Sequence, residues 1–349
     1  MKKNEFIFLI VASLGLWVTI APSSYADPTV EQSIPERVFD VPEKKIVTVI
    51  IENDSLGGGT DKNYTSGIRV NFTDTDVEFP RMAYEIDKLI PTFKINRTSS
   101  IYYSLGQNIY TPRDTARTSL NPYDRPWAGF LYGTLGMVTL TNNHADEVEA
   151  TLGIIGPAAM GEWSQKFIHK NITDSPVPEG WSHQLKNEPG VMLAWQRSWP
   201  MAVKGQIENN FWSVKPYFGA TVGNIYTYGD IGFTLRISPY DSRWQDTPLR
   251  VRPSMPGTGI YEFPSNKWSW ALFSGIEARA VARNIFLDGN TFANSHSVEK
   301  NPFVVDATAG AAVTYNNTRI SYTIVYRTNE FTLQDDPEIF GALSLGVRF

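Results

Sequence analysis

The chain has 349 residues, a formal net charge of −5, no cysteine and an aromatic content of 13%. The absence of cysteine excludes disulfides, thiolate catalysis and cysteine-ligated metal sites. A mildly acidic chain without a basic cluster is a poor binder of nucleic acids, so we expect no nucleic-acid partner.

The N-terminus has the pattern of a secretory signal peptide. Lys2 and Lys3 precede an apolar core over residues 6–20, and the small residues around Ala26 suit cleavage before Asp27. The competing interpretation is a transmembrane anchor, but the apolar run is short for one. We therefore predict a signal peptide over residues 1–26 and an exported mature chain.

The C-terminal residues alternate strictly between apolar and polar or small side chains. Leu343, Leu345, Val347 and Phe349 share one face, and Arg348 lies on the other. A soluble β-sandwich could also end this way. The export signal, the missing cysteines and the aromatic excess favour a transmembrane β-barrel in the outer membrane of a Gram-negative bacterium.

We therefore expect an all-β fold, a single antiparallel outer-membrane barrel domain over residues 27–349. Its terminal strand, which ends at Phe349, would be the segment that the barrel-assembly machinery recognises, and outer-membrane lipids would surround the wall. Twelve strands are expected, an even number as single-chain barrels require, although the region 200–240 can be divided in more than one way. In chain order they cover about 46–54, 64–74, 100–111, 129–141, 146–155, 189–199, 213–226, 229–237, 268–281, 303–316, 318–328 and 341–349.

The first two strands predict which side chains face the barrel interior. Alternation places Thr48, Glu52 and Asp54 inside on the first strand, and Thr65, Gly67, Arg69 and Asn71 inside on the second. A short helix is expected near 82–89.

Strand parity predicts which loops lie outside the cell. With both termini in the periplasm, the external loops are 55–63, 112–128, 156–188, 282–302 and 329–340, and the 156–188 loop is expected to carry short helices. The turns at Asn142–Asn143 and Asn316–Asn317 fall on the periplasmic side, where short connections are typical. The segment 238–267 also falls there, and its length has no explanation from the pattern.

The external loops contain the residues best suited to chemistry. Asn53 and Asp54 end the first strand before a glycine-rich tip, and they supply hard oxygen ligands that suit calcium better than zinc or copper. Gln165 and His169 are four residues apart, which places them on one face of a helix. A neutral imidazole can take a proton from water, and a cation can stabilise the oxyanion of an ester.

Simpler interpretations of these residues remain open. The glycine-rich tip can be a flexible hairpin with Asp54 as a turn residue, and His169 can be structural. His183 lies in the same loop, while His144 and His296 are expected to be solvated surface residues. The chain lacks a Gly-x-Ser-x-Gly elbow, an EF-hand spacing, a His-Glu-x-x-His motif and a phosphate-binding loop.

Five stretches between residues 52 and 190, taken in order, resemble the lipid A 3′-O-deacylase (LpxR) family of outer-membrane proteins. The terminal half of the chain matches only as generic barrel strands. The five stretches are Glu52-Asn53-Asp54 with Asp61 and Tyr64 to Gly67, Gly106 to Pro112, Asp124 to Gly129, Gly153 to Pro157 continuing through Gln165 to His169, and Gly180-Trp181 with Gln184 to Gly190.

The resemblance implies a twelve-stranded barrel and a calcium-dependent esterase. Its substrate would be lipopolysaccharide, from whose lipid A it removes the 3′-linked acyloxyacyl chain. His169 resembles the general base of the family. Asn53, Asp54 and Thr65 match its polar active-site group, with Asp54 as the candidate calcium ligand, and Gln165 falls on the matching helical face.

One departure from the family pattern concerns the metal ligands. The family has an acidic site residue shortly after the histidine, in a region whose length differs in this chain. Asp174 or Glu179 could take that place, and the sequence does not choose between them. Two other functions remain open: a barrel without enzymatic activity that acts as a pore or adhesin, and an esterase that acts on phospholipids.

Overall fold

The structure is a computed structural model that describes residues 38–57, 63–79, 81–88, 93–173, 176–241, 244, 250–251, 259–264 and 267–349. The predicted signal peptide lies outside these residues. So do residues 58–62 of the glycine-rich tip, and Asp174.

Thirteen strands form one antiparallel sheet in the described part of the chain. They are β1 (Lys45–Asn53), β2 (Asn63–Asp74), β3 (Ser100–Thr111), β4 (Ala128–Thr141), β5 (His144–Ile155), β6 (Glu188–Ser198), β7 (Val203–Ile207), β8 (Asn210–Gly223), β9 (Tyr226–Ser238), β10 (Trp268–Asn284), β11 (Phe303–Tyr315), β12 (Thr318–Arg327) and β13 (Glu338–Arg348).

Twelve of these strands close into a barrel, which confirms the predicted architecture. β1 pairs with β13, and β6 pairs with β8, so every backbone edge of the ring has a neighbour. The thirteenth strand, β7, pairs only with the first part of β8, beyond the segment that pairs with β6. The sequence missed β7 because it lies outside the closed wall and has no buried face to impose alternation.

Side-chain direction follows the predicted alternation on β1, β2 and β13. Thr48 and Glu52 on β1 are buried inside, and Arg69 and Asn71 on β2 are completely inaccessible to solvent. Outward-facing Ile51 is 45% exposed, as expected of a side chain that faces lipid. The terminal strand behaves in the same way, with the apolar residues of the predicted face exposed and Arg348 buried.

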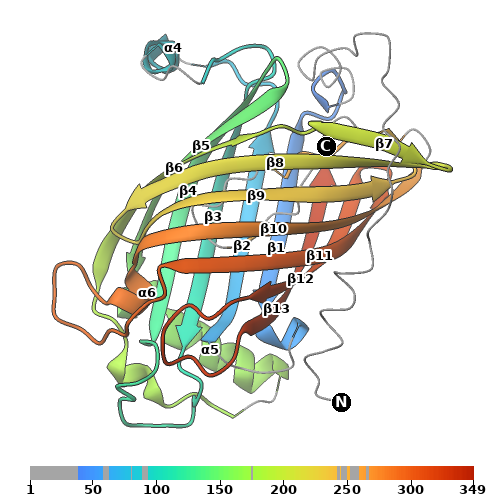
Figure 1. Ribbon diagram of the computed structural model, residues 1–349. Helices are drawn as coiled ribbons and strands as arrows, with labels where there is room; N and C mark the ends of the chain where they lie inside the picture. Colours follow the sequence, from blue (N-terminus) through green and yellow to red (C-terminus); the bar gives the residue numbers. More distant parts are fainter. Residues whose placement is uncertain are drawn as a thin grey trace.

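Short helices gather mainly at one end of the barrel. α4 (Arg81–Asp87), which confirms the predicted helix, lies at the same end as β7 and the C-terminus, whereas α5 and α6 lie at the opposite end (Figure 1). We call that opposite end the external rim. Its helical segments are η1 (Asp54–Leu56), η2 (Pro157–Ala159), α5 (Gly161–Ile168), the π-helical η3 (His169–Thr173), η4 (Gly180–His183) and α6 (Ile285–Asp288). No helix in the described part of the chain is long and apolar enough to span a membrane.

Several described residues between β9 and β10 lie inside the barrel. Trp244, Ile260 and Tyr261 are buried in a cluster with inward-facing residues such as Ile46 and Val138. The connection is longer than a turn requires, and its described residues Trp244, Ile260 and Tyr261 help to fill the barrel interior in addition to joining two strands.

An ion pair joins the same segment to the interior of the wall. Arg250 pairs with Glu52 of β1, and Glu52 Oε1 also accepts a hydrogen bond from the backbone N–H of Val251 at 3.1 Å. The hydroxyl of Tyr132 on β4 donates to the Val251 carbonyl at 2.6 Å. Contacts with β1 and β4 therefore hold Arg250 and Val251. We call the described residues between β9 and β10 the interior segment.

This arrangement predicts that Arg250→Met loosens the interior segment. Removing one partner of a buried ion pair costs about 3–5 kcal/mol because the other charge stays buried and unpaired. We expect purified wild-type protein to be silent in single-channel recordings and the variant to conduct. Lys267→Met is the control, since Lys267 belongs to the same connection but is exposed. Steady conductance of the wild type, or a silent and folded Arg250→Met, would contradict the prediction.

Candidate active site

A buried arginine ties two loops of the external rim together. Arg125, in the loop between β3 and β4, pairs with Glu330 at 3.3 Å and with Glu338 at 3.2 Å. Its guanidinium also lies over the ring of Tyr110, 5.2 Å from the centroid. Arg125 is fully buried and compensates both carboxylates, and Glu330 also pairs with Arg327 at 3.6 Å.

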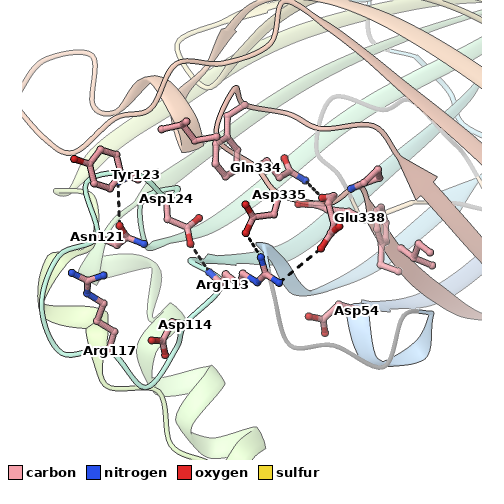
Figure 2. Close-up of a pocket in the computed structure, with 16 residues that line it drawn as sticks. Asp54, Arg113, Asp114, Arg117, Asn121, Tyr123, Asp124, Gln334, Asp335 and Glu338 are labelled. Atoms are coloured by element: carbon pink, nitrogen blue, oxygen red, sulfur yellow. Dashed lines mark hydrogen bonds and ion pairs between the residues drawn. The ribbon is translucent and has the colours of Figure 1, made fainter. Parts of the chain in front are cut away.

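Above this anchor lies a cavity of about 380 Å³ at the barrel mouth (Figure 2). Arg113 extends across it and pairs with Asp335, and the backbone N–H of Arg113 donates to the Asp124 carboxylate at 2.8 Å. The lining is rich in charged and polar side chains from η1, the β3–β4 loop and the β12–β13 loop: Asp54, Arg113, Asp114, Arg117, Asn121, Tyr123, Asp124, Gln334, Asp335, Asp336 and Glu338.

The end of β1 places Asp54 in this cavity. Asn53 is the N-cap of η1, and its side chain accepts a hydrogen bond from the Ser55 N–H at 2.8 Å, which ends the strand one residue earlier than predicted. Asp54 is only 3% exposed and lines the cavity, as its predicted inward direction required. Thr65 lies where the β2–β3 register shifts between Tyr64 and Ser66.

α5 carries the other predicted pair. Gln165 and His169 are 1% and 5% exposed and lie on the same face, and the His169 backbone N–H donates to the Gln165 carbonyl. The opposite face carries Trp163 and Phe167, which are exposed. The four-residue spacing therefore gave the correct face for both predicted residues.

α5 packs against the outer surface of the barrel wall. Gly129 points outward on β4, since its neighbours on either side face the interior, and it directly contacts Gly161 of α5. A Cβ on Gly161 would lie 2.9 Å from the Gly129 Cα, so no side chain fits between helix and wall. Gln107, which faces outward on β3, donates to the Ala159 carbonyl at 2.6 Å.

Hydrogen bonds fix the orientation of both buried side chains. Trp181 Nε1 donates to Gln165 Oε1 at 2.8 Å, and Gln165 Nε2 has no hydrogen-bond acceptor among the described residues. His169 Nδ1 lies 2.7 Å from the Pro176 carbonyl oxygen, which can only accept. A neutral His169 ring therefore carries its proton on Nδ1 and its lone pair on Nε2, the form that acts as a base.

The predicted residues thus fall into two groups on one rim. Asp54 lines the cavity, whereas Gln165 and His169 lie on α5 and are not among the cavity residues. The segment after α5 is joined to the cavity loop, because the Glu179 N–H donates to the Thr115 carbonyl and His183 Nε2 donates to the Thr118 carbonyl, both at 2.9 Å. Glu179 itself is exposed.

Two of the histidine predictions were wrong. His296 is half-buried, and its Nε2 donates to the Asp124 carbonyl at 2.7 Å. His144 opens β5 and lies 3.3 Å from Asp146. Their partners come from distant or buried positions that the local polar sequence did not indicate. Sequence reasoning also missed the roles of Trp181 and Arg125, both of which lie within the stretches that carried the family resemblance.

Comparisons with known proteins agree with the barrel fold. A family model described as "Outer membrane protein LpxR" matches residues 9–349. LpxR from Salmonella typhimurium has a similar structure, with a TM-score of 0.70 and 19% identity over 87% of this chain and 100% of that one. The β domain of the Bordetella autotransporter BrkA is much less similar, with a TM-score of 0.40 and 9% identity over 88% of this chain and 99% of that one. A search of curated protein sequences found no match.

The buried position of Arg125 predicts that Arg125→Met releases the β3–β4 loop. Loss of the cation removes the ion pair of buried Glu338 and leaves buried Glu330 with Arg327 alone, at 3.6 Å. About 1.4 kcal/mol of local destabilisation raises the opened population tenfold. We expect trypsin to cleave after the exposed Arg113 or Arg117 about tenfold faster than in the wild type. Lys186→Met, at an exposed rim position, is the control and should cleave at the wild-type rate. Equal rates for all three proteins would show that Arg125 does not hold the loop.

Proposed function

The chain belongs to the LpxR family of outer-membrane proteins, and from this membership and the α5 geometry we propose that it is a lipid A 3′-O-deacylase. The enzyme hydrolyses the ester that holds the 3′-linked acyloxyacyl chain. The observation that carries this proposal is the buried pair on α5, Gln165 and His169, with His169 Nδ1 engaged by the Pro176 carbonyl. α5 also lies on the outer surface of the wall, the side of the barrel that faces membrane lipid.

In the proposed reaction His169 is the general base. Its Nε2 accepts a proton from a water molecule, and the oxygen of that water attacks the ester carbonyl carbon. The protonated imidazole then gives the proton to the departing sugar oxygen as the acyl C–O bond breaks, which yields a carboxylic acid and a free hydroxyl group. The hydrogen bond from Nδ1 to Pro176 holds the ring in place through both transfers.

Gln165 is proposed to bind the oxyanion. Trp181 holds its carbonyl oxygen, so the Nε2 amide is the part of the side chain left to donate toward a substrate. A donor that is already oriented stabilises the developing negative charge without reorganising during the reaction. Trp181 is therefore a positioning residue, and Gln165 is the residue that contacts the reacting atoms.

We also propose calcium as the cofactor, with Asp54 as its side-chain ligand and Asn53 and Thr65 in the same polar group. The donor chemistry fits a hard cation, since Asp54 is a buried carboxylate at the cavity wall. No cluster of three His, Cys, Asp or Glu side chains that could hold a metal occurs among the described residues. Main-chain carbonyls and water, which calcium accepts readily, would complete the shell. When bound, the ion would supply positive charge in the cavity, on the same rim as the α5 pair.

The interior segment argues against the alternative of an open pore. Trp244, Val251 and Tyr261 are buried in the barrel interior, which removes much of the space that a conducting path would need. An esterase acting on phospholipids would use the same residues, and a substrate panel would distinguish it from a lipid A deacylase.

The proposal predicts that His169→Ala abolishes deacylation of lipopolysaccharide. Removing a general base lowers the rate about 10²–10⁴-fold, and mass spectrometry of the lipid A product measures the loss of the 3′ acyloxyacyl group. His183→Ala is the matched control, because His183 lies in the same loop and its Nε2 bonds the Thr118 carbonyl. Retained activity in His169→Ala, or unchanged lipid A with the wild type under varied conditions, would exclude the proposed role or substrate.

Calcium dependence is tested separately. We expect a chelator to stop the reaction of the wild type and added calcium to restore it. Asp54→Asn should require more calcium for half-maximal rate, because a neutral amide is a weaker calcium ligand than a carboxylate. Asp76→Asn, an exposed position at the opposite end of the barrel, should behave like the wild type. Full activity in the presence of the chelator would remove calcium from the mechanism.

A further inference from the structure

The exposed face of α5 has no role in the proposed chemistry. Trp163 and Phe167 are 61% and 48% exposed, and Met160, just before the helix, is 51% exposed. The two aromatic rings stack with their centroids 5.5 Å apart and an interplanar angle of 18°. Together with Met160 they line a groove of about 490 Å³. Large apolar side chains that gather on one exposed face indicate an interaction surface.

The position of this face identifies its partner. α5 is packed against the outward side of β3 and β4 through Gly129 and Gln107, so its own exposed face points away from the barrel axis. Leu105 lies two residues from Gln107 on β3, faces outward in the same way and is 63% exposed. Two residues along a strand span about 7 Å. Ala159, two residues before α5, therefore contacts a side chain that neighbours Leu105 on the outward face of β3.

We propose that α5 is a membrane-interfacial helix whose Met160–Trp163–Phe167 face is inserted among the lipids of the outer leaflet. On the outward side of β3, exposed Leu105 is followed by Gln107, whose polar side chain bonds the Ala159 carbonyl of η2, just before α5. Aromatic side chains are favoured at the boundary between hydrocarbon and headgroups. The proposal rests on the outer-membrane location of the barrel and does not depend on the deacylase activity.

Charged residues on α5 agree with an interfacial position. Lys166 pairs with Glu162 at 2.6 Å on the flank of the apolar face, and Lys170 is exposed one turn after Lys166. Lysine side chains at this depth can place their ammonium groups among anionic headgroups while the stems lie along apolar surface. Because Gln165 and His169 occupy the opposite face, lipid contact on one side of the helix would press the other side toward the wall.

Spin labelling tests the depth of the helix directly. The chain has no cysteine, so Trp163→Cys and Phe167→Cys each introduce a single labelling position. Power saturation of the nitroxide-labelled protein in lipid bilayers measures the accessibility of each label to two relaxing agents. Oxygen partitions into hydrocarbon, and a nickel chelate stays in water. Leu105→Cys reports the lipid-facing wall, and Ser119→Cys reports an exposed position on the β3–β4 loop.

We expect the labels at 163 and 167 to be more accessible to oxygen than to the nickel chelate, with a ratio close to that of the label at 105. Labels at 163 and 167 that match the nickel accessibility at 119 would overturn the proposal. Phe167→Cys keeps Trp163 in place, so one label remains informative if the other variant folds poorly. The heat-dependent gel migration typical of folded barrels identifies the folded samples. The result stands apart from the deacylation assay, because it requires no substrate.

Discussion

The need to pair every backbone group inside a lipid bilayer governs the whole structure. Because no water can satisfy an open strand edge in hydrocarbon, the sheet closes through the β1–β13 and β6–β8 pairs. Closure divides each strand into an interior face and a lipid face. It is this division that lets Glu52 and Arg69 be buried in charged contacts while Ile51 faces outward. The candidate functional residues then lie on one of these two surfaces.

The protein uses both surfaces. Asp54 extends the interior face of β1 into the polar cavity at the mouth, whereas α5 lies on the outer surface with Gln165 and His169 turned inward. An enzyme that acts on a membrane lipid benefits from such a division, since the acyl chain stays in the hydrocarbon while the polar headgroup lies above the rim. Trp181 orients Gln165, and the Pro176 carbonyl orients His169, each through one hydrogen bond. Arg125 holds the cavity loops through buried ion pairs.

Period-two alternation and residue spacing predicted much of this structure. Strict alternation located the twelve strands of the wall and the inward direction of Glu52 and Arg69, and the four-residue spacing located the face shared by Gln165 and His169. Tertiary contacts decided the rest. The interior segment could not be recognised because its burial depends on Glu52, about 200 residues earlier in the chain. The register shift near Thr65 likewise depends on the pairing of β2 with β3.

The contact between Gly129 and Gly161 sets how the site can vary among related sequences. The separation of helix and wall is determined there by two main chains and by no side chain, since a Cβ on either residue would meet the backbone of the other at 2.9–3.0 Å. Residues on the exposed face of α5 can change in size without moving Gln165 and His169, whereas a single methyl group at either glycine would lift the helix from the wall. Variation is therefore open to the residues around this contact and closed to the two glycines themselves.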